Sequence, residues 1–322
     1  MRSLVLLLSL MTATFSVAQT SATREAEFAI GGIRQYVTIS GGDRTLPLLL
    51  FLHGGPGGSV MNYADKFTDR LRQHFIVIQW DQRETGRTRE LNSSPIPLSL
   101  ALFESDTRAL IDTLLHRFGR EKLYLAGHSW GTALGFDIAR KYPDRLYAFI
   151  AIGPMINQLE SERISLSMMK ERARKAGNRQ ETEELAGVNI PFADAGQLYF
   201  HRKWLSVLSG SRRTLSESYV KDWSATWLPV FNEASKENLM KTLPEIGCPV
   251  YFFLGKNDYQ TNSAIAEAYY NFVKAPKKGL FWFDCAHSIP SAQPERMQKI
   301  IIETVLPETF PALEKNVPLP AH

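Results

Sequence analysis

Two near-continuous runs of apolar residues, LPLLLFL (46–52) and FIVIQW (75–80), constrain the fold of this chain most strongly. Runs without polar alternation suit strands that are covered on both faces, as in a parallel sheet. Further strands are predicted at 122–127, 146–153, 249–255 and 279–284, with helix patterns at 98–119, 132–143, 262–274 and 293–305. This alternation predicts an α/β fold with a mostly parallel sheet flanked by helices.

The alternation stops between residues 155 and 243. This stretch consists of polar, helix-like segments dotted with aromatic residues, and the strand–helix order resumes after it. We therefore predict a core made of residues 19–154 and 244–322, interrupted by an inserted helical cap at 155–243. Near the start of the core, the glycine-punctuated stretch 28–42 predicts a short antiparallel hairpin.

The first eighteen residues have the pattern of a secretory signal peptide. Arg2 is followed by an apolar stretch at 4–11, and the segment ends in the small residues of SVA (16–18). The apolar stretch is too short to span a bilayer permanently. We expect cleavage near Gln19, a periplasmic or secreted mature protein, and no stable membrane anchor after cleavage.

The charge balance bears on nucleic-acid binding, and the positions of the two cysteines bear on disulfide formation. With 37 basic and 33 acidic residues the net charge is +4, and no basic stripe interleaved with aromatics points to a nucleic-acid partner. Cys248 precedes one predicted strand and Cys285 follows another. In a parallel sheet they lie at opposite ends, so we predict two free thiols. The motifs indicate neither a metal nor a cofactor.

The pentapeptide GHSWG (127–131) places Ser129 between two glycines, where a predicted strand passes into a predicted helix. A strand–turn–helix context is what gives the G-x-S-x-G pattern its chemical meaning, because the sharp turn projects the hydroxyl above the sheet. The helix N-terminus beside it favours negative charge. We predict Ser129 to be a nucleophile rather than part of an ordinary turn.

A serine hydroxyl needs a base, and the base needs a carboxylate to orient it. In this architecture the chain order is serine, acid, histidine, each after a strand. His287 follows the last predicted strand and is the expected base. Asp258 follows the preceding strand and is the preferred acid; Asp284 is its competitor.

The segment HGGPGG (53–58) directly follows the apolar run 46–52. Its glycines leave backbone N–H groups exposed in a tight turn, as an oxyanion hole requires. We predict Gly55 as one donor and Trp130, the residue after the nucleophile, as the other. A phosphate-binding loop is disfavoured, because neither G-x-x-x-x-G-K-[ST] nor G-x-G-x-x-G is present.

These segments together resemble a known family. HGGPGG (53–58), WDQRETGRT (80–88), GHSWGT (127–132), GKND (255–258) and AHS (286–288) are similar to the α/β-hydrolase fold, and more narrowly to the proline iminopeptidase branch of serine peptidases. The resemblance covers nearly the whole mature chain. It implies a Ser129–His287–Asp258 triad, Gly55 and Trp130 as oxyanion donors, and a cap that closes over the substrate.

The chain departs from that branch in two places. The usual D-Q-R-G continues as Glu84 here, and no glutamate directly follows Trp227 in DWSATWLPVFNEAS (222–235). The family binds the free amine of an N-terminal proline with acidic cap residues. Glu233 is the candidate for that role, and Glu160 and Glu162 are alternatives. Trp227 and Trp204 are expected to contact the substrate.

The sequence therefore predicts a serine hydrolase that releases N-terminal proline from small peptides or amides. A carboxylesterase using the same triad is the alternative, and a catalytically silent binding protein on the same scaffold is a remote one. The expected partner is a small molecule or short peptide. The sequence does not specify the oligomeric state.

Overall fold

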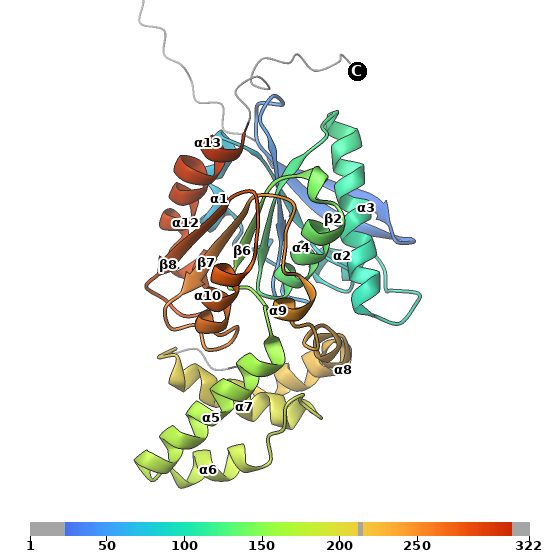
Figure 1. Ribbon diagram of the computed structural model, residues 1–322. Coiled ribbons are helices and arrows are strands. Elements are labelled where there is room, and N and C mark those ends of the chain that lie inside the picture. The colour runs from blue at the N-terminus through green and yellow to red at the C-terminus, as the bar shows by residue number, and fades with distance from the viewer. Residues whose placement is uncertain (1–22, 212–214, 311–322) are drawn as a thin grey trace, which may run out of the picture.

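The computed structural model describes residues 23–211 and 215–310, and the expected signal peptide lies outside them. Within these ranges, eight strands form one sheet in the order β1-β2-β4-β3-β5-β6-β7-β8 (Figure 1). The strands are β1 (Arg24–Ile30), β2 (Ile33–Ser40), β3 (Leu48–Leu52), β4 (Ile76–Trp80), β5 (Leu123–His128), β6 (Leu146–Ile152), β7 (Val250–Gly255) and β8 (Lys278–Phe283). The β1–β2 hairpin is antiparallel, whereas β3 to β8 are parallel. The predicted α/β fold is confirmed.

The apolar runs are continuous because both faces of the sheet are buried. In β3, Leu48, Leu50 and Leu52 pack in the larger of two hydrophobic clusters, whereas Leu49 and Phe51 pack in the other. Each buried leucine contributes about 1.5–3 kcal/mol relative to an exposed one. A strand without polar alternation is thereby fixed at the centre of the sheet.

Helices pack against both faces of the sheet. The helices of the core are α1 (Asp65–Thr68), α2 (Gly86–Leu91), α3 (Leu100–Phe118), α4 (Trp130–Lys141), α9 (Leu239–Thr242), α10 (Ser263–Phe272), α11 (Ile289–Ala292), α12 (Pro294–Ile300) and α13 (Leu306–Thr309). Helix α3 begins where the Ser99 side chain accepts the Leu102 N–H, and it ends at Gly119, which has φ +60°. The last predicted helix, 293–305, is present but changes type: α12 passes into a π-helical turn at Ile301–Val305, and α13 continues from it with right-handed helical backbone at both junctions.

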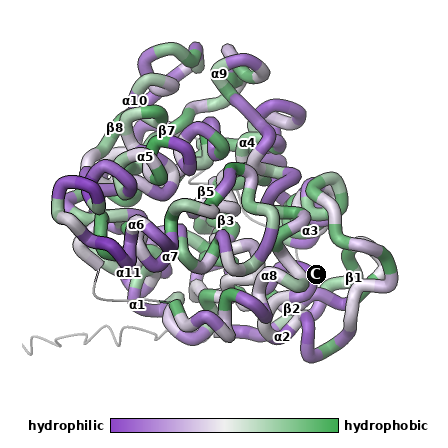
Figure 2. The backbone as a smooth tube through the Cα atoms, turned by 90° about the horizontal axis from the view of Figure 1, so that it is seen from below, coloured by the Kyte–Doolittle hydropathy of each residue, from purple (hydrophilic) through white to green (hydrophobic). Residues whose placement is uncertain are grey.

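Between β6 and β7 the described residues form helices and no strand: the short α9 precedes β7, and four helices make up the rest of the insertion. They are α5 (Gln158–Ala176), α6 (Arg179–Ala186), α7 (Ala195–Leu208) and α8 (Glu217–Ala234), and Figure 1 shows them below the sheet. The view from that side in Figure 2 shows hydrophilic stretches along α5 and α6. Among the described residues, no helix combines the length and apolar character needed to cross a bilayer. Both cysteines are free, as predicted.

Candidate active site

Ser129 lies at a sharp bend between β5 and α4. Its backbone has φ +54° and ψ −120°, a conformation that costs a non-glycine residue on the order of 1–3 kcal/mol. The bend needs glycines on both sides. A Cβ on Gly127 would lie 2.6 Å from the Gly131 carbonyl oxygen, and one on Gly131 would lie 2.2 Å from the Leu52 carbonyl oxygen. The G-x-S-x-G spacing therefore reflects close backbone packing.

Asp258 and His287 meet beyond the carboxyl ends of β7 and β8. His287 Nδ1 lies 2.8 Å from Asp258 Oδ2. The other carboxylate oxygen, Oδ1, accepts the Gln260 and Thr261 N–H groups at 3.0 and 3.1 Å, and the Thr261 hydroxyl donates to Oδ2 at 2.8 Å. Burial alone would raise the pKa of Asp258, but His287 and these hydrogen bonds outweigh it and hold that pKa below its usual value.

The competing acid, Asp284, lies elsewhere. It is exposed and forms an ion pair with Lys256 at the surface. Of the two candidate acids, the structure therefore brings only Asp258 to the imidazole of His287. Thr261 was not singled out from the sequence, although a hydroxyl three residues after the acid is well placed to fix the carboxylate.

His287 is held next to the serine bend by His128, the residue that precedes Ser129. The two imidazole rings lie 5.0 Å apart, and His128 Nε2 donates to the His287 carbonyl oxygen at 3.1 Å. Burial lowers the pKa of His128 to about 4, so its ring is neutral at pH 7. His287 Nε2 is buried and has no hydrogen-bond partner among the described residues. Such contacts often form only in the substrate complex.

The glycine-rich loop 53–58 runs directly against the serine bend. A Cβ on Gly54 would lie 3.3 Å from Ser129 Cβ. The next residue, Gly55, has φ +122°. Trp130 is the first residue of α4, where backbone N–H groups lack acceptors within the helix. The loop and the N-terminus of α4 therefore both adjoin the serine bend, and N–H groups without acceptors at a helix N-terminus favour an anionic group.

The three residues expected to contact substrate lie in different places. Trp227 of α8 packs against the glycine-rich loop, since a Cβ on Gly57 would lie 2.4 Å from Trp227 Nε1. Trp204 is buried within the four-helix insertion and donates to Glu184 Oε2 at 2.8 Å. Glu233 is exposed and accepts the Leu100 N–H at 2.9 Å. Only Trp227 reaches the glycine-rich loop.

The alternative glutamates are both paired. Glu162 is buried and receives two hydrogen bonds from Arg202, at 2.6 and 2.7 Å, and one from Gln158 at 2.7 Å. Burial alone would raise the pKa of Glu162, but Arg202 outweighs it and keeps that pKa below its usual value. Glu160 pairs with Arg163 at the surface. The charge of Glu162 is therefore already compensated within the insertion.

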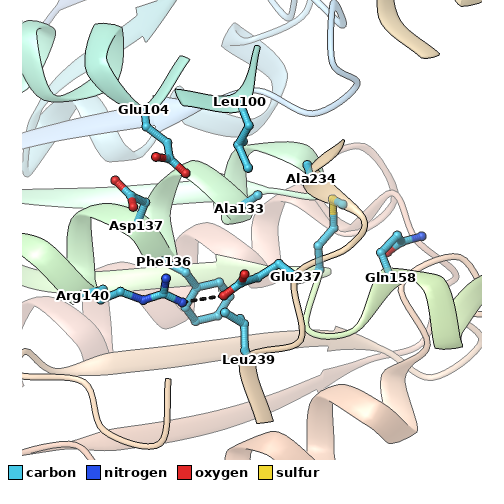
Figure 3. Close-up of a pocket in the computed structure, with 11 residues that line it drawn as sticks. Leu100, Glu104, Ala133, Phe136, Asp137, Arg140, Gln158, Ala234, Glu237 and Leu239 are labelled. Atoms are coloured by element: carbon cyan, nitrogen blue, oxygen red, sulfur yellow. Dashed lines mark hydrogen bonds and ion pairs between the residues drawn. The ribbon is translucent and has the colours of Figure 1, made fainter. Parts of the chain in front are cut away.

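A cleft of about 530 Å³ opens beside His287, between the insertion and the sheet edge. Its polar lining includes Arg202, Asn257 and Gln260, and the described residues that line it include no carboxylate. A second, smaller cavity of about 50 Å³ lies between α3, α4 and α9, where Arg140 pairs with Glu237 (Figure 3). None of Ser129, Asp258 and His287 lines that cavity, so it is separate from the site.

His201, which lies beside Glu162, leads to a prediction about acid stability. Burial lowers the pKa of His201 to about 4, below the ordinary value of about 6.5. The unfolded chain therefore binds an extra proton between pH 6.5 and 4, and stability falls as the pH drops through this window. In urea titrations the His201→Gln variant should lose about 1.4 kcal/mol per pH unit less than the wild type. Equal slopes would contradict a neutral His201.

Comparison with known proteins identifies the family of this chain and its relatives. Residues 47–261 match the alpha/beta hydrolase fold family. The probable aminopeptidase YbaC of Bacillus subtilis is 29% identical over 286 residues, which are 82% of this chain and 90% of that protein. The proline iminopeptidase of Thermoplasma volcanium is 25% identical over 218 residues, which are 66% and 67% of the two chains.

A solved structure shares the fold. The proline iminopeptidase of Mycobacterium smegmatis aligns with a TM-score of 0.60 at 18% identity, covering 88% of this chain and 97% of that one. The family match spans more than half of the chain and includes β3, the serine bend and Asp258. The chain belongs to the α/β-hydrolase fold family, in its proline iminopeptidase-like branch.

Proposed function

We propose that this hydrolase uses Ser129 as its nucleophile, His287 as general base and Asp258 as the carboxylate that orients the imidazole. The observation that carries the proposal is the 2.8 Å contact between His287 Nδ1 and Asp258 Oδ2. With Nδ1 engaged, Nε2 is the nitrogen left to take a proton. The buried, unpartnered Nε2 and the link from His128 to the His287 loop both favour Ser129 as the source of that proton.

The reaction then follows from these groups. Ser129 Oγ attacks the substrate carbonyl carbon while His287 Nε2 takes its proton, and the negative charge that develops moves to the carbonyl oxygen. The Gly55 and Trp130 N–H groups stabilise that oxyanion. His287 returns the proton to the leaving group, which leaves an acyl-enzyme. Water, activated by the same imidazole, attacks the acyl carbon and releases the acid.

For the substrate, we propose a small peptide or amide with an N-terminal proline. The support comes from relatives named as aminopeptidase and proline iminopeptidase. The insertion at 155–243 would serve as the cap. Its α8 contacts the glycine-rich loop through Trp223 Nε1, which donates to the Pro56 carbonyl oxygen at 2.9 Å. Motion of α8 would therefore displace the loop that carries the Gly55 N–H.

A carboxylesterase is the second candidate, and the placement of the cap glutamates favours it. A substrate ammonium group needs an uncompensated carboxylate, but Glu162 is paired with Arg202 and Glu233 binds the N-terminus of α3. An ester without a charged amine has no such requirement. The two candidates share the triad and differ only in how the acyl group is recognised.

One set of measurements on the purified chain tests both levels of the proposal. A fluorophosphonate probe should label Ser129, as mass spectrometry of the tryptic peptide would show. Faster hydrolysis of L-proline 4-nitroanilide than of N-acetyl-L-proline 4-nitroanilide indicates an aminopeptidase, whereas hydrolysis of 4-nitrophenyl acetate alone indicates an esterase. Absence of labelling would contradict the triad and revive the silent binding protein.

Gly153, at the end of β6, provides a prediction about the acid–base pair. It has φ +51°, and an added Cβ would lie 3.2 Å from His287 Nδ1 and 3.3 Å from Asp258 Oδ2. Gly153→Ala should lose about 1–2 kcal/mol of stability from its backbone conformation and, by displacing the pair, on the order of 10-fold in kcat. Gly119→Ala is the matched control, because Gly119 has φ +60° and open space around its Cβ position. Equal kcat losses in both variants would contradict the prediction.

A further inference from the structure

A single side chain, Gln82, connects the two elements that carry the predicted oxyanion donors. Its Oε1 accepts the indole N–H of Trp130 at 3.0 Å, and its Nε2 donates to the His53 carbonyl oxygen at 3.3 Å. Its own backbone N–H donates to His53 Nε2 at 3.2 Å. Gln82 is 1% exposed, so water does not compete for these hydrogen bonds. One amide therefore joins the helix that begins at Trp130 to the start of the glycine-rich loop.

The loop end of this connection is fixed by His53. Because His53 Nε2 accepts a hydrogen bond, its proton is on Nδ1, which donates to the Gly54 carbonyl oxygen at 2.8 Å. Burial lowers the pKa of His53 to about 4, so this tautomer is neutral at pH 7. The imidazole thus bridges Gln82 and the peptide unit between Gly54 and Gly55. The N–H group of that peptide unit is the predicted donor of Gly55.

The helix end of the connection is fixed by the Trp130 side chain. The indole is fully buried and packs edge-on against Phe103, with ring centroids 5.6 Å apart and planes at 89°. Its only polar atom, Nε1, is the group that binds Gln82. Anchoring the indole limits rotation of the first turn of α4, and this turn carries the Trp130 backbone N–H.

We propose that Gln82 is a positioning residue that sets the relative placement of the two oxyanion donors. The inference rests on the proposed serine hydrolase function. The amide is specific for the task, because Oε1 must accept from an indole while Nε2 must donate to a carbonyl. Methionine is nearly isosteric, but it cannot donate and its sulfur accepts only weakly. Each oxyanion donor that is displaced weakens the stabilisation of the developing charge, so loss of Gln82 affects the transition state more than substrate binding.

Gln35 supplies the matched control, because it has the same structural role of pairing a buried indole N–H. Gln35 is also fully buried, and its Oε1 accepts the indole N–H of Trp80 at 2.9 Å while its Nε2 donates to Asp106 at 2.7 Å. Like Gln82, it joins an indole N–H to a second acceptor, here the Asp106 carboxylate together with the Ile30 carbonyl oxygen at 3.3 Å, but it bonds to neither oxyanion element. Gln82→Met and Gln35→Met should both destabilise the fold, since each leaves a buried indole N–H unpaired.

The experiment compares the two variants in the full chain. The measurements are kcat and KM with L-proline 4-nitroanilide or 4-nitrophenyl acetate, whichever the wild type hydrolyses, the inhibition constant of phenylboronic acid, and urea unfolding. Boronic acids form tetrahedral adducts with a reactive serine and so report on the oxyanion site. Gln82→Met should lower kcat by about 10- to 100-fold, weaken phenylboronic acid by a similar factor, and leave KM nearly unchanged. Gln35→Met should change none of these three.

Two outcomes would overturn the inference. One is equal behaviour of the two variants, and the other is a loss confined to KM. Gln82→Asn, whose shorter side chain cannot reach both partners, repeats the test if Gln82→Met does not fold. If both Gln82 variants fail to fold while Gln35→Met folds, the role of Gln82 is structural and the inference is wrong. A wild type that fluorophosphonate does not label would instead refute the proposed function itself.

Discussion

Replacing Ser129 with alanine should lower kcat by a factor on the order of 10⁶ and abolish labelling by fluorophosphonate. The alanine retains the backbone and the neighbouring donors, so substrate binding should persist while covalent chemistry is lost. Steady-state hydrolysis and gel fluorescence of the labelled protein measure the two effects. Ser291→Ala is the control, because Ser291 is exposed and donates only to the Ser288 carbonyl oxygen. Labelling that survives in Ser129→Ala would place the nucleophile elsewhere.

Measuring the stability of two Ser129 variants separates the loss of the hydroxyl from misfolding. Ser129 has φ +54°, which alanine adopts only with strain but glycine adopts freely. Ser129→Gly should therefore be as inactive as Ser129→Ala, yet about 1 kcal/mol more stable in urea unfolding. Inactive variants that differ in this direction would show that backbone strain is maintained at the bend to present the hydroxyl.

The fold could be predicted because its signals are local. A run such as LLLFL at 48–52 fills both faces of one strand, and the helix that ends at Gly119 carries its own start and stop residues. The Asp258–His287 contact could also be anticipated, because parallel strands end at one edge of the sheet and bring their following loops together. These inferences needed chain order and periodicity but no knowledge of how helices face one another.

The remaining site features depend on packing that is not encoded locally. Glu233 and Trp227 both belong to α8, but the rotation of that helix brings Trp227 to the glycine-rich loop and Glu233 to the N-terminus of α3. Trp204 faces Glu184 for the same kind of reason. Gln82 belongs to the motif WDQRETGRT (80–88), but nothing in that motif indicates its hydrogen-bond partners. These partners, Trp130 and His53, are distant in sequence. Such contacts depend on tertiary packing and can be identified only from the three-dimensional structure.

Asp258→Asn should reduce kcat by about 10⁴-fold with little change in KM. The Gln260 and Thr261 N–H groups bind Oδ1, so the asparagine oxygen keeps that position and its amide NH₂ replaces Oδ2. The NH₂ would then donate to His287 Nδ1, where the carboxylate had accepted. The imidazole proton moves to Nε2, and the base can no longer take a proton from Ser129. The variant therefore loses activity because His287 carries its proton on Nε2, although the contact between residues 258 and 287 is kept.

The pH dependence and a matched variant test this explanation. Because the pKa of Asp258 is held below its usual value, the carboxylate stays charged at neutral pH, and the stability it contributes is lost only as the pH falls through that lowered value. The turnover deficit of Asp258→Asn should therefore persist throughout the neutral range, and fluorophosphonate labelling should slow in parallel. Asp284→Asn removes the exposed competitor, which pairs with Lys256, and should change kcat by no more than about two-fold. The reverse ranking of the two variants would assign the acid to Asp284, despite its position at the surface.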